Sequence, residues 1–304
     1  MDNNLKTRCL VIKLILQDGV FSGLANNVKI IKDLTMDVNI NKVSGLMPTT
    51  ASVVIYGMLD SDINLLSRLQ LFAGQTLPTN IIEIYAGYEL CTDGLPPLAY
   101  KGLIWTAGVD KNDVDHPFRI YSLVYGLATN LIESTEVKGT IGLNELLQGM
   151  VTNYNAQASN DKLIYSPNNV SAVVQDQSYS GGSIIDLMTQ ACTPYDYIVQ
   201  LSYPYILVYK KGDSPTKNEV IINKNNGMLG YPVPEDLGIS CRIRYNPNID
   251  WGYQITVESS IQFTGINNEV ITSWYINAMN TTLQNRGDKW ESVLKLGVYN
   301  RGVV

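Results

Sequence analysis

The only histidine in the chain, His116, limits the chemistry that the sequence can support. One imidazole excludes His-rich metal sites and the H-E-x-x-H motif, and it allows at most one histidine base. His116 stands directly before Pro117, in a polar stretch that is typical of a turn. We therefore expect a surface-loop histidine, and we predict no catalytic residue, no cofactor and no metal ligand in this chain.

A chain with a single histidine could still use a pair of carboxylates for acid-base catalysis. A glycosidase needs only two acids held about 5 to 9 Å apart. The glutamates on or near predicted strands are Glu83, Glu133, Glu136, Glu258 and Glu291. The alternation of the strands places Glu83, Glu258 and Glu291 on outward faces, where we expect them to be solvated. A carboxylate-based glycosidase that acts on cell wall therefore remains an alternative.

Two further patterns suggest binding rather than catalysis. Gly181-Gly182-Ser183 precedes a predicted helix and resembles a phosphate cradle, but it lacks the lysine and the spacing of a P-loop, so we interpret it as a plain helix start. Five tyrosines gather around one predicted hairpin: Tyr195, Tyr197, Tyr203, Tyr205 and Tyr209. Tyrosine is enriched at protein interfaces, which favours an interface or sheet packing over sugar binding.

The cysteines and the overall charge narrow the class of protein. Cys9, Cys91, Cys192 and Cys241 are far apart, unlike the ligands of a C-x-x-C site, and we expect them to be reduced and buried. The net charge of −6 argues against a basic surface that grips nucleic acid. The apolar run at 9–16 is split by Lys13 and predicts a first strand rather than a signal peptide. We expect neither membrane insertion nor export.

The composition and the periodicity predict a β-rich chain. Only 16% of the 304 residues are charged, against about 25% in an average soluble protein. Alternating apolar residues predict about six strands in the first 130 residues, with a short helix at 60–69 that Asp60 or Ser61 would cap. Helical spacing then predicts one helix over 143–154 and another from Ser183, which Asp186 would help to cap and Pro194 would end. A hairpin over 197–209 follows, and strands resume from 239 to 296.

This order predicts a mainly β fold with an α+β insert. Many short antiparallel strands hide their edges most simply by closing into a barrel. We therefore expect two antiparallel β-barrel domains, at 1–133 and 215–304, on either side of a small α+β domain at 134–214.

Several segments, taken in order, resemble the baseplate hub (tail hub) proteins of tailed bacteriophages and related injection machines. The resemblance lies in Ala51–Leu59, in Ile82–Tyr88 followed by Tyr100–Ile104, in Asn226–Pro232, in Tyr245–Ile249 and in Arg286–Ser292. The last segment, Arg-Gly-Asp-Lys-Trp-Glu-Ser, is similar to the closing G-D-x-x-W strand of the family. A histidine often precedes that G-D, and this chain departs from the pattern with Leu283-Gln-Asn-Arg.

The resemblance implies a structural protein of the virion tail baseplate, assembled in the host cytoplasm. It implies a homotrimer whose six barrels form a ring that joins a six-fold tail tube, or a distal tail protein, to a three-fold central spike. The channel would let the genome and the tape measure pass. Low charge and abundant tyrosine agree with large permanent interfaces. The cell-wall glycosidase and a sugar-binding tail module remain the alternatives.

Overall fold

The computed structural model describes residues 7–43, 49–67, 80–88, 94–110, 113–124, 131–158, 162–211, 213, 215, 218–236, 238–264 and 270–298. Strands make up 51% and helices 14% of the described residues, so the prediction of a mainly β chain is confirmed. The predicted helix end at Leu69, the cysteine Cys91 and the predicted strand end at Tyr125 lie outside the described residues. None of the helices within these ranges is long and apolar enough to span a membrane.

The elements follow the predicted order of strands, helices and strands. The first part contains β1 (Arg8–Ile15), β2 (Val28–Ile31), β3 (Thr35–Val43), β4 (Thr50–Tyr56), α1 (Asp60–Leu66), β5 (Ile81–Tyr88), β6 (Leu98–Val109) and β7 (Phe118–Leu123). The middle part contains β8 (Leu131–Ile132), β9 (Thr135–Glu136), β10 (Thr140–Gly142), α2 (Leu143–Gln157), β11 (Ile164–Asn168), β12 (Val173–Gln175), β13 (Ser178–Tyr179), β14 (Gly182–Ser183), α3 (Ile184–Cys192), the 3-10 helix η2 (Thr193–Tyr195), β15 (Tyr197–Ser202) and β16 (Tyr205–Lys210). The last part contains β17 (Glu219–Ile222), β18 (Val233–Glu235), β19 (Gly238–Arg244), β20 (Gln254–Val257), β21 (Phe263–Thr264), β22 (Val270–Ile271), β23 (Ser273–Gln284) and β24 (Trp290–Val298).

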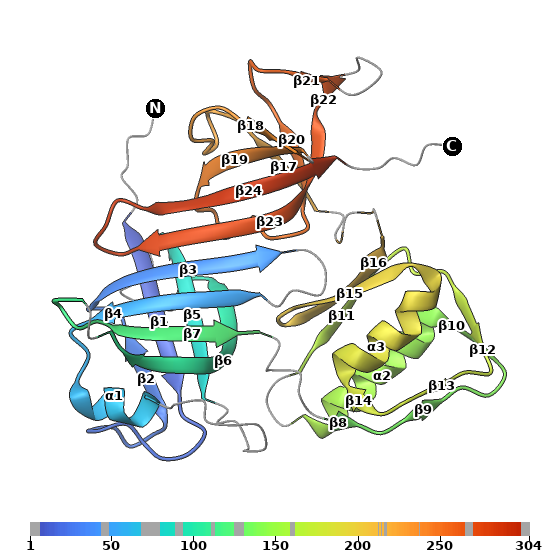
Figure 1. Cartoon of the computed structure of the whole chain (residues 1–304), viewed down its shortest axis with the longest axis horizontal. Helices are drawn as coiled ribbons and strands as arrows, with labels where there is room; N and C mark the ends of the chain where they lie inside the picture. The colour runs from blue at the N-terminus through green and yellow to red at the C-terminus, as the bar shows by residue number, and fades with distance from the viewer. Residues whose placement is uncertain are drawn as a thin grey trace.

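One large sheet joins the first and last parts of the chain. Eleven of its thirteen strands run in the order β18-β19-β24-β23-β3-β4-β7-β6-β5-β1-β2. Of the other two, β20 pairs with β23, and β17 pairs with β20. The junction is the antiparallel pairing of β3 with β23, which lie side by side in Figure 1. Across the described strands these pairings do not close into separate barrels. The two parts therefore share a continuous backbone ladder.

Alternation along the strands explains which face each strand buries. In β1, Leu10, Ile12 and Leu14 share one face and are almost inaccessible to solvent; on the opposite face Lys13 is half-buried, but Cys9 and Val11 are buried as well. The apolar side chains form two cores. The larger core fills the curled first part and continues into the middle part, and the smaller one lies under β19, β20, β23 and β24. Leu207 and Tyr209 of β16 belong to the smaller core, so the middle part packs against the last part.

In the middle part, the structure confirms most of the elements that the sequence predicts. The apolar stripe of α2 is buried, and α3 packs against both α2 and β15. Ser183 accepts a hydrogen bond from the backbone N–H of Asp186, whose side chain accepts one from the Ser183 backbone, so the predicted capping box is present. β15 and β16 form the predicted hairpin through Tyr203 and a cis Pro204. In Figure 1 the two helices lie on one side of the β11-β16-β15 sheet.

The predicted cap of α1 is wrong. The helix begins at Asp60, and Leu59 is the extended residue at the N-cap, without a side-chain cap bond. Asp60 already has helical geometry, so its carboxylate is not placed to cap the first turn. The fully buried Asp62 instead forms an ion pair with Lys29 of β2, which fastens the helix to the sheet.

The cysteine prediction holds only in part. Cys192 and Cys241 are free and buried, as expected, and burial raises the pKa of each thiol to about 12. Cys9 is disulfide-bonded, so the expectation of a reduced thiol is wrong there. A disulfide requires two cysteines whose Cα atoms lie close together in space. The spacing of the cysteines along the sequence does not show which segments become neighbours in the fold.

Candidate functional site

The residues that could have done acid-base chemistry lie apart from one another. His116 is an exposed residue with a left-handed backbone (φ 43°) in the turn between β6 and β7, which confirms the surface-loop prediction. Glu133 and Glu136 are exposed near β9, and Glu258 is exposed after β20, where it accepts a hydrogen bond from Asn223. Glu291 forms a 2.7 Å ion pair with Arg242. That these glutamates are not catalytic remains a prediction.

Glu83 is buried, which corrects the prediction that it is solvated. Its carboxylate lies 2.9 Å from Lys13 Nζ and 3.3 Å from Lys101 Nζ, and it accepts a 2.7 Å hydrogen bond from the Tyr85 hydroxyl. Lys13, Glu83 and Lys101 are direct cross-strand neighbours on β1, β5 and β6. The sequence showed an outward position, but it did not show that lysines on both neighbouring strands would cover it.

This charge cluster also connects the sheet to the middle part of the chain. Lys101 Nζ lies 4.9 Å from the centre of the Tyr203 ring and 3.4 Å from its hydroxyl, at the turn of the β15-β16 hairpin. Gln200 of the same hairpin donates a 2.7 Å hydrogen bond to the Val43 carbonyl of β3. The hairpin is therefore held against two strands of the large sheet.

The charges around Glu83 determine how it titrates. Burial by itself raises the pKa of Glu83, but the hydrogen bonds from Lys13 and Tyr85 and the charge of Lys101 outweigh burial and hold that pKa below its ordinary value. A carboxyl whose folded pKa is lowered stabilises the fold fully above its unfolded pKa of about 4.5, and this contribution is lost as the pH falls through the folded pKa.

Substitution of Glu83 by glutamine is expected to lower the free energy of unfolding at pH 7 by about 1 to 3 kcal/mol, because Lys13 and Lys101 lose their counter-charge. The deficit should shrink as the pH falls below 4.5 and through the lowered pKa of the native Glu83 carboxyl, because that carboxyl then loses its own charge. Urea unfolding at pH 7 and again at a pH well below 4.5 measures this deficit in the free energy of unfolding. The exposed Glu258→Gln is the matched control. A deficit that is the same at both pH values would show that the charge of Glu83 does not matter.

The outward face of the joined sheet carries a row of side chains that crosses the junction between the two parts. In cross-strand register the row reads Tyr121, Ser52, Asn39, Thr282, Glu291 and Arg244. At the junction, Asn39 and Asn280 exchange two hydrogen bonds of 3.1 Å each. Tyr121 is 41% exposed at one end of the row, near Trp105 at 39%. The row is thus aromatic at one end, neutral and polar in the middle, and charged at the other end.

An aromatic cluster holds the two parts together at one end of the junction. The Trp290 ring lies 6.3 Å from the ring of Tyr88 and 5.8 Å from that of Tyr245, in edge-to-face contact with both. The Tyr88 hydroxyl donates a 2.9 Å hydrogen bond to the Tyr245 carbonyl. Arg8 of β1 donates a 2.8 Å bond to the Gly287 carbonyl in the β23-β24 turn. These contacts join β1 and β5 to β24, in addition to the backbone ladder.

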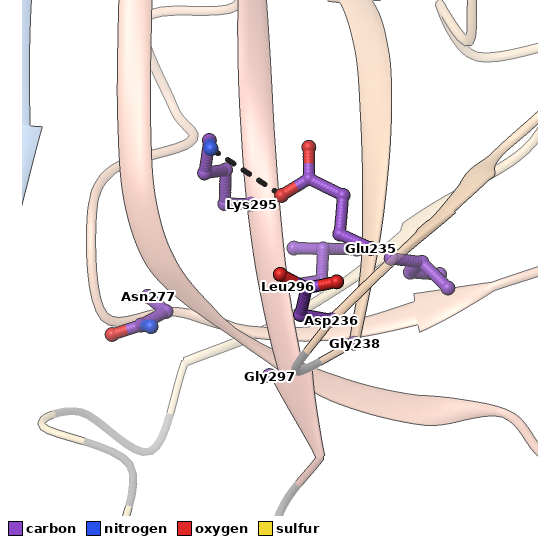
Figure 2. Close-up of a pocket in the computed structure, with 8 residues that line it drawn as sticks. Glu235, Asp236, Gly238, Asn277, Lys295, Leu296 and Gly297 are labelled. Carbon is purple, nitrogen blue, oxygen red and sulfur yellow. Dashed lines mark ion pairs between the residues drawn. The ribbon is translucent and has the colours of Figure 1, made fainter.

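A cavity of about 360 Å³ opens between β18, β19 and β24, where Gly238 and Gly297 face each other across the strands. Figure 2 shows the Glu235 carboxylate reaching toward Lys295, at an ion-pair distance of 3.3 Å, with Asp236 alongside. Within the described ranges, no cluster of three or more His, Cys, Asp or Glu could hold a metal ion. The carboxylate of Glu235 is engaged by the lysine.

The five tyrosines do not form one surface. Tyr209 is buried in the smaller core, 6.1 Å from the Trp251 ring, and Tyr203 covers Lys101. Tyr205 is 46% exposed and lines a cavity of about 420 Å³ together with Tyr253. The tyrosines mostly pack the hairpin against its neighbours, as the sheet-packing interpretation expected.

The chain is thus a mainly β scaffold whose first and last parts are joined by one ladder, and the row on its outward face runs from aromatic through neutral to charged. The model of the baseplate hub gp41 family matches residues 11–295, and the chain belongs to this family of phage tail baseplate proteins. The family resemblance found in the sequence is thereby confirmed. No curated protein sequence matches the chain significantly.

Solved structures share the fold at low sequence identity. A tail protein from Neisseria meningitidis MC58 is 10% identical with a TM-score of 0.56, covering 96% of this chain and 97% of that one. The 43 kDa tail protein of prophage MuSo2 from Shewanella oneidensis is 9% identical with a TM-score of 0.53, covering 97% and 98%. The E. coli c3393 protein, a type VI secretion component described as similar to the T4 tail proteins gp27 and gp5, is 9% identical with a TM-score of 0.52, covering 95% and 77%.

Proposed function

We propose that this chain is a non-enzymatic baseplate hub subunit that forms a homotrimer. Three copies would build a ring that adapts a six-fold tail tube, or a distal tail protein, to a three-fold central spike. The ring would leave a channel through which DNA and the tape measure pass during infection. Residues 1–133 and 215–304 would each supply one barrel-like half, and residues 134–214 a peripheral α+β domain. The protein would reside in the virion tail after assembly in the host cytoplasm.

The observation that carries this proposal is the β3-β23 junction, within a chain that belongs to a baseplate hub family. A ring that bridges two symmetries needs each subunit to hold its two β halves in a fixed relation. A continuous ladder, together with the Tyr88-Trp290-Tyr245 cluster, supplies that rigidity. If the two halves were linked only by a flexible segment, relative motion would be the default expectation.

The chemistry of the outward face also supports a structural role. Permanent interfaces are depleted of charge at their cores and enriched in aromatic residues. The central members of the row, Ser52, Asn39 and Thr282, are uncharged, and Tyr121 stands beside them. The fold shared with the c3393 protein supports an association with tail proteins, since that protein is described as similar to gp27 and gp5.

The mass of the protein in solution tests this proposal, measured by light scattering alone and after mixing with the central spike protein of the same phage. Three chains of 33.7 kDa give a trimer of about 101 kDa, to which the mass of the spike adds. We expect three copies for each trimeric spike. A strict monomer that stays monomeric with the spike present would overturn the proposal.

A further inference from the structure

A polar cavity of about 420 Å³ lies where the middle part of the chain meets the last part. One wall belongs to the β11-β16-β15 sheet. Leu207 and Tyr209 of β16 face the smaller core, and by alternation Tyr205 belongs to the same face. Ser166 of β11 is the register partner of Leu207, and Ser202 of β15 is that of Tyr205, so both serines face the same way. The pairing of the three strands therefore lines this wall with hydroxyl groups.

The opposite wall is the turn that leads into β20, and it is held in place by hydrogen bonds. Trp251 is only 2% exposed, and its indole N–H donates a 2.9 Å hydrogen bond to the Asn277 carbonyl. The Oδ1 atom of Asp250 accepts a 2.6 Å bond from Lys42 Nζ and a 2.7 Å bond from the Trp251 backbone N–H. Tyr253 follows in the same turn and also lines the cavity. The cavity is therefore preformed, as most small-ligand sites are.

The polar side chains of this cavity keep their hydrogen-bonding capacity for a ligand. Five of them form no side-chain hydrogen bond with another described residue: Ser166, Ser202, Tyr205, Asn218 and Tyr253. Each of the five is partly or largely exposed, so a ligand could reach it. Asp250 uses only its Oδ1 atom, which leaves Oδ2 to accept a further bond. By contrast, Gln200 and Lys101, at the other contacts of the middle part, are engaged with the large sheet and its neighbours.

We propose that this cavity binds a neutral saccharide unit. A sugar ring has hydroxyl groups at its edge and C–H groups on its faces, so it matches both the free polar groups and the rings of Tyr205 and Tyr253. The ligand is uncharged, because Asp250 is the only charged side chain among the described lining residues and Lys42 already balances it.

The site binds a sugar without cleaving it. Glycoside hydrolysis needs two carboxyl groups about 5 to 9 Å apart, and the described lining of the cavity has one. Of the five hairpin tyrosines only Tyr205 lines the cavity, so the others keep their packing role. This inference goes beyond the proposed function and does not depend on a trimer, because all of these groups belong to one chain.

A glycan array probed with the labelled full chain tests the proposal. The array carries neutral hexose oligomers, N-acetylglucosamine oligomers, and oligosaccharides that contain uronic or sialic acid. We expect the protein to bind a neutral oligosaccharide and to bind none of the acidic ones. Binding to the hexose arm indicates a cell-surface polysaccharide as the source, whereas binding to the N-acetylglucosamine arm indicates the peptidoglycan backbone. A native protein that binds no glycan, or that binds the acidic ones best, would overturn the proposal.

Two variants then locate the site by calorimetric titration with the oligosaccharide that the array identifies. Tyr205→Ala removes a ring and a hydroxyl, and Asn218→Trp fills the cavity from an exposed position, so each should weaken binding by about tenfold or more. Tyr231→Ala is the matched control, because Tyr231 is 65% exposed and does not line this cavity. Circular dichroism checks that all three variants fold.

If both cavity variants bind the oligosaccharide as tightly as the native chain, the glycan lies elsewhere and the inference is overturned. The same result for Tyr231→Ala as for Tyr205→Ala would also overturn it, because the loss would then not be specific to the cavity. The mass of the assembly is measured separately. A chain that binds the sugar but never forms a trimer would overturn the proposed function alone.

Discussion

Replacement of Trp290 by alanine is expected to lower the free energy of unfolding by about 3 to 5 kcal/mol, which is typical for the loss of a buried aromatic side chain. Only 4% of Trp290 is exposed, and its ring contacts Tyr88 of β5 and Tyr245 after β19. The truncation opens a cavity at the point where the two β parts meet, and it also removes the ring that the Arg8 guanidinium approaches at 5.9 Å. The loss should therefore affect the relation of the two parts as well as total stability.

Urea unfolding followed by tyrosine and tryptophan fluorescence measures this loss. Trp105→Ala is the matched control, since Trp105 lies on the same sheet but is 39% exposed, and its substitution should change stability by about 0.5 kcal/mol or less. If the two variants lose equal stability, Trp290 does not hold the junction. If Trp290→Ala unfolds in two steps, the first step would report separation of the two parts.

Replacement of Gly238 by alanine is the second large effect that we expect. A Cβ at this position would stand 1.9 Å from the Leu296 carbonyl oxygen, which is a backbone atom of the neighbouring strand β24. Because backbone in a paired strand cannot move aside without breaking its ladder, the β19-β24 pairing must shift. We expect a loss of about 3 kcal/mol or more, at the upper end of the range for overpacking.

Gly108→Ala is the control for this prediction. Gly108 also lies in a strand of the large sheet, β6, but a Cβ there would meet nothing within 4 Å. That variant should be neutral or slightly stabilising, because alanine loses less conformational entropy than glycine on folding. Thermal unfolding of the two variants separates steric clash from loss of glycine flexibility. Equal melting temperatures for both variants would contradict the close approach of β19 and β24.

Local patterns predicted the elements of this fold well. The alternation of Leu10, Ile12 and Leu14 identified β1, and the spacing of Leu143, Leu147 and Met150 identified α2, because side chains that share a face recur at fixed intervals. The capping box of Ser183 and Asp186 was predicted for the same reason. Each of these signals depends only on residues close together in the sequence.

The relations between distant strands could not be predicted in this way. Asn39 and Asn280 are 241 residues apart, and nothing in either segment specifies that they would lie diagonally across one pair of strands. The burial of Glu83 follows from having Lys13 and Lys101 as strand neighbours, and the disulfide of Cys9 follows from a similar proximity in space. The expected barrels were inferred from the need to hide edges, whereas β3 and β23 hide two edges by pairing with each other.

Electron microscopy of the hub bound to its spike protein tests the central claim most directly. Class averages should show a closed ring with three-fold symmetry, six β-rich lobes and an open centre. The ring should stay intact when peptidoglycan is added, and the peptidoglycan suspension should keep its turbidity. A compact particle without a central opening, or an assembly without three-fold symmetry, would contradict the assignment of this chain as the subunit of a trimeric baseplate ring.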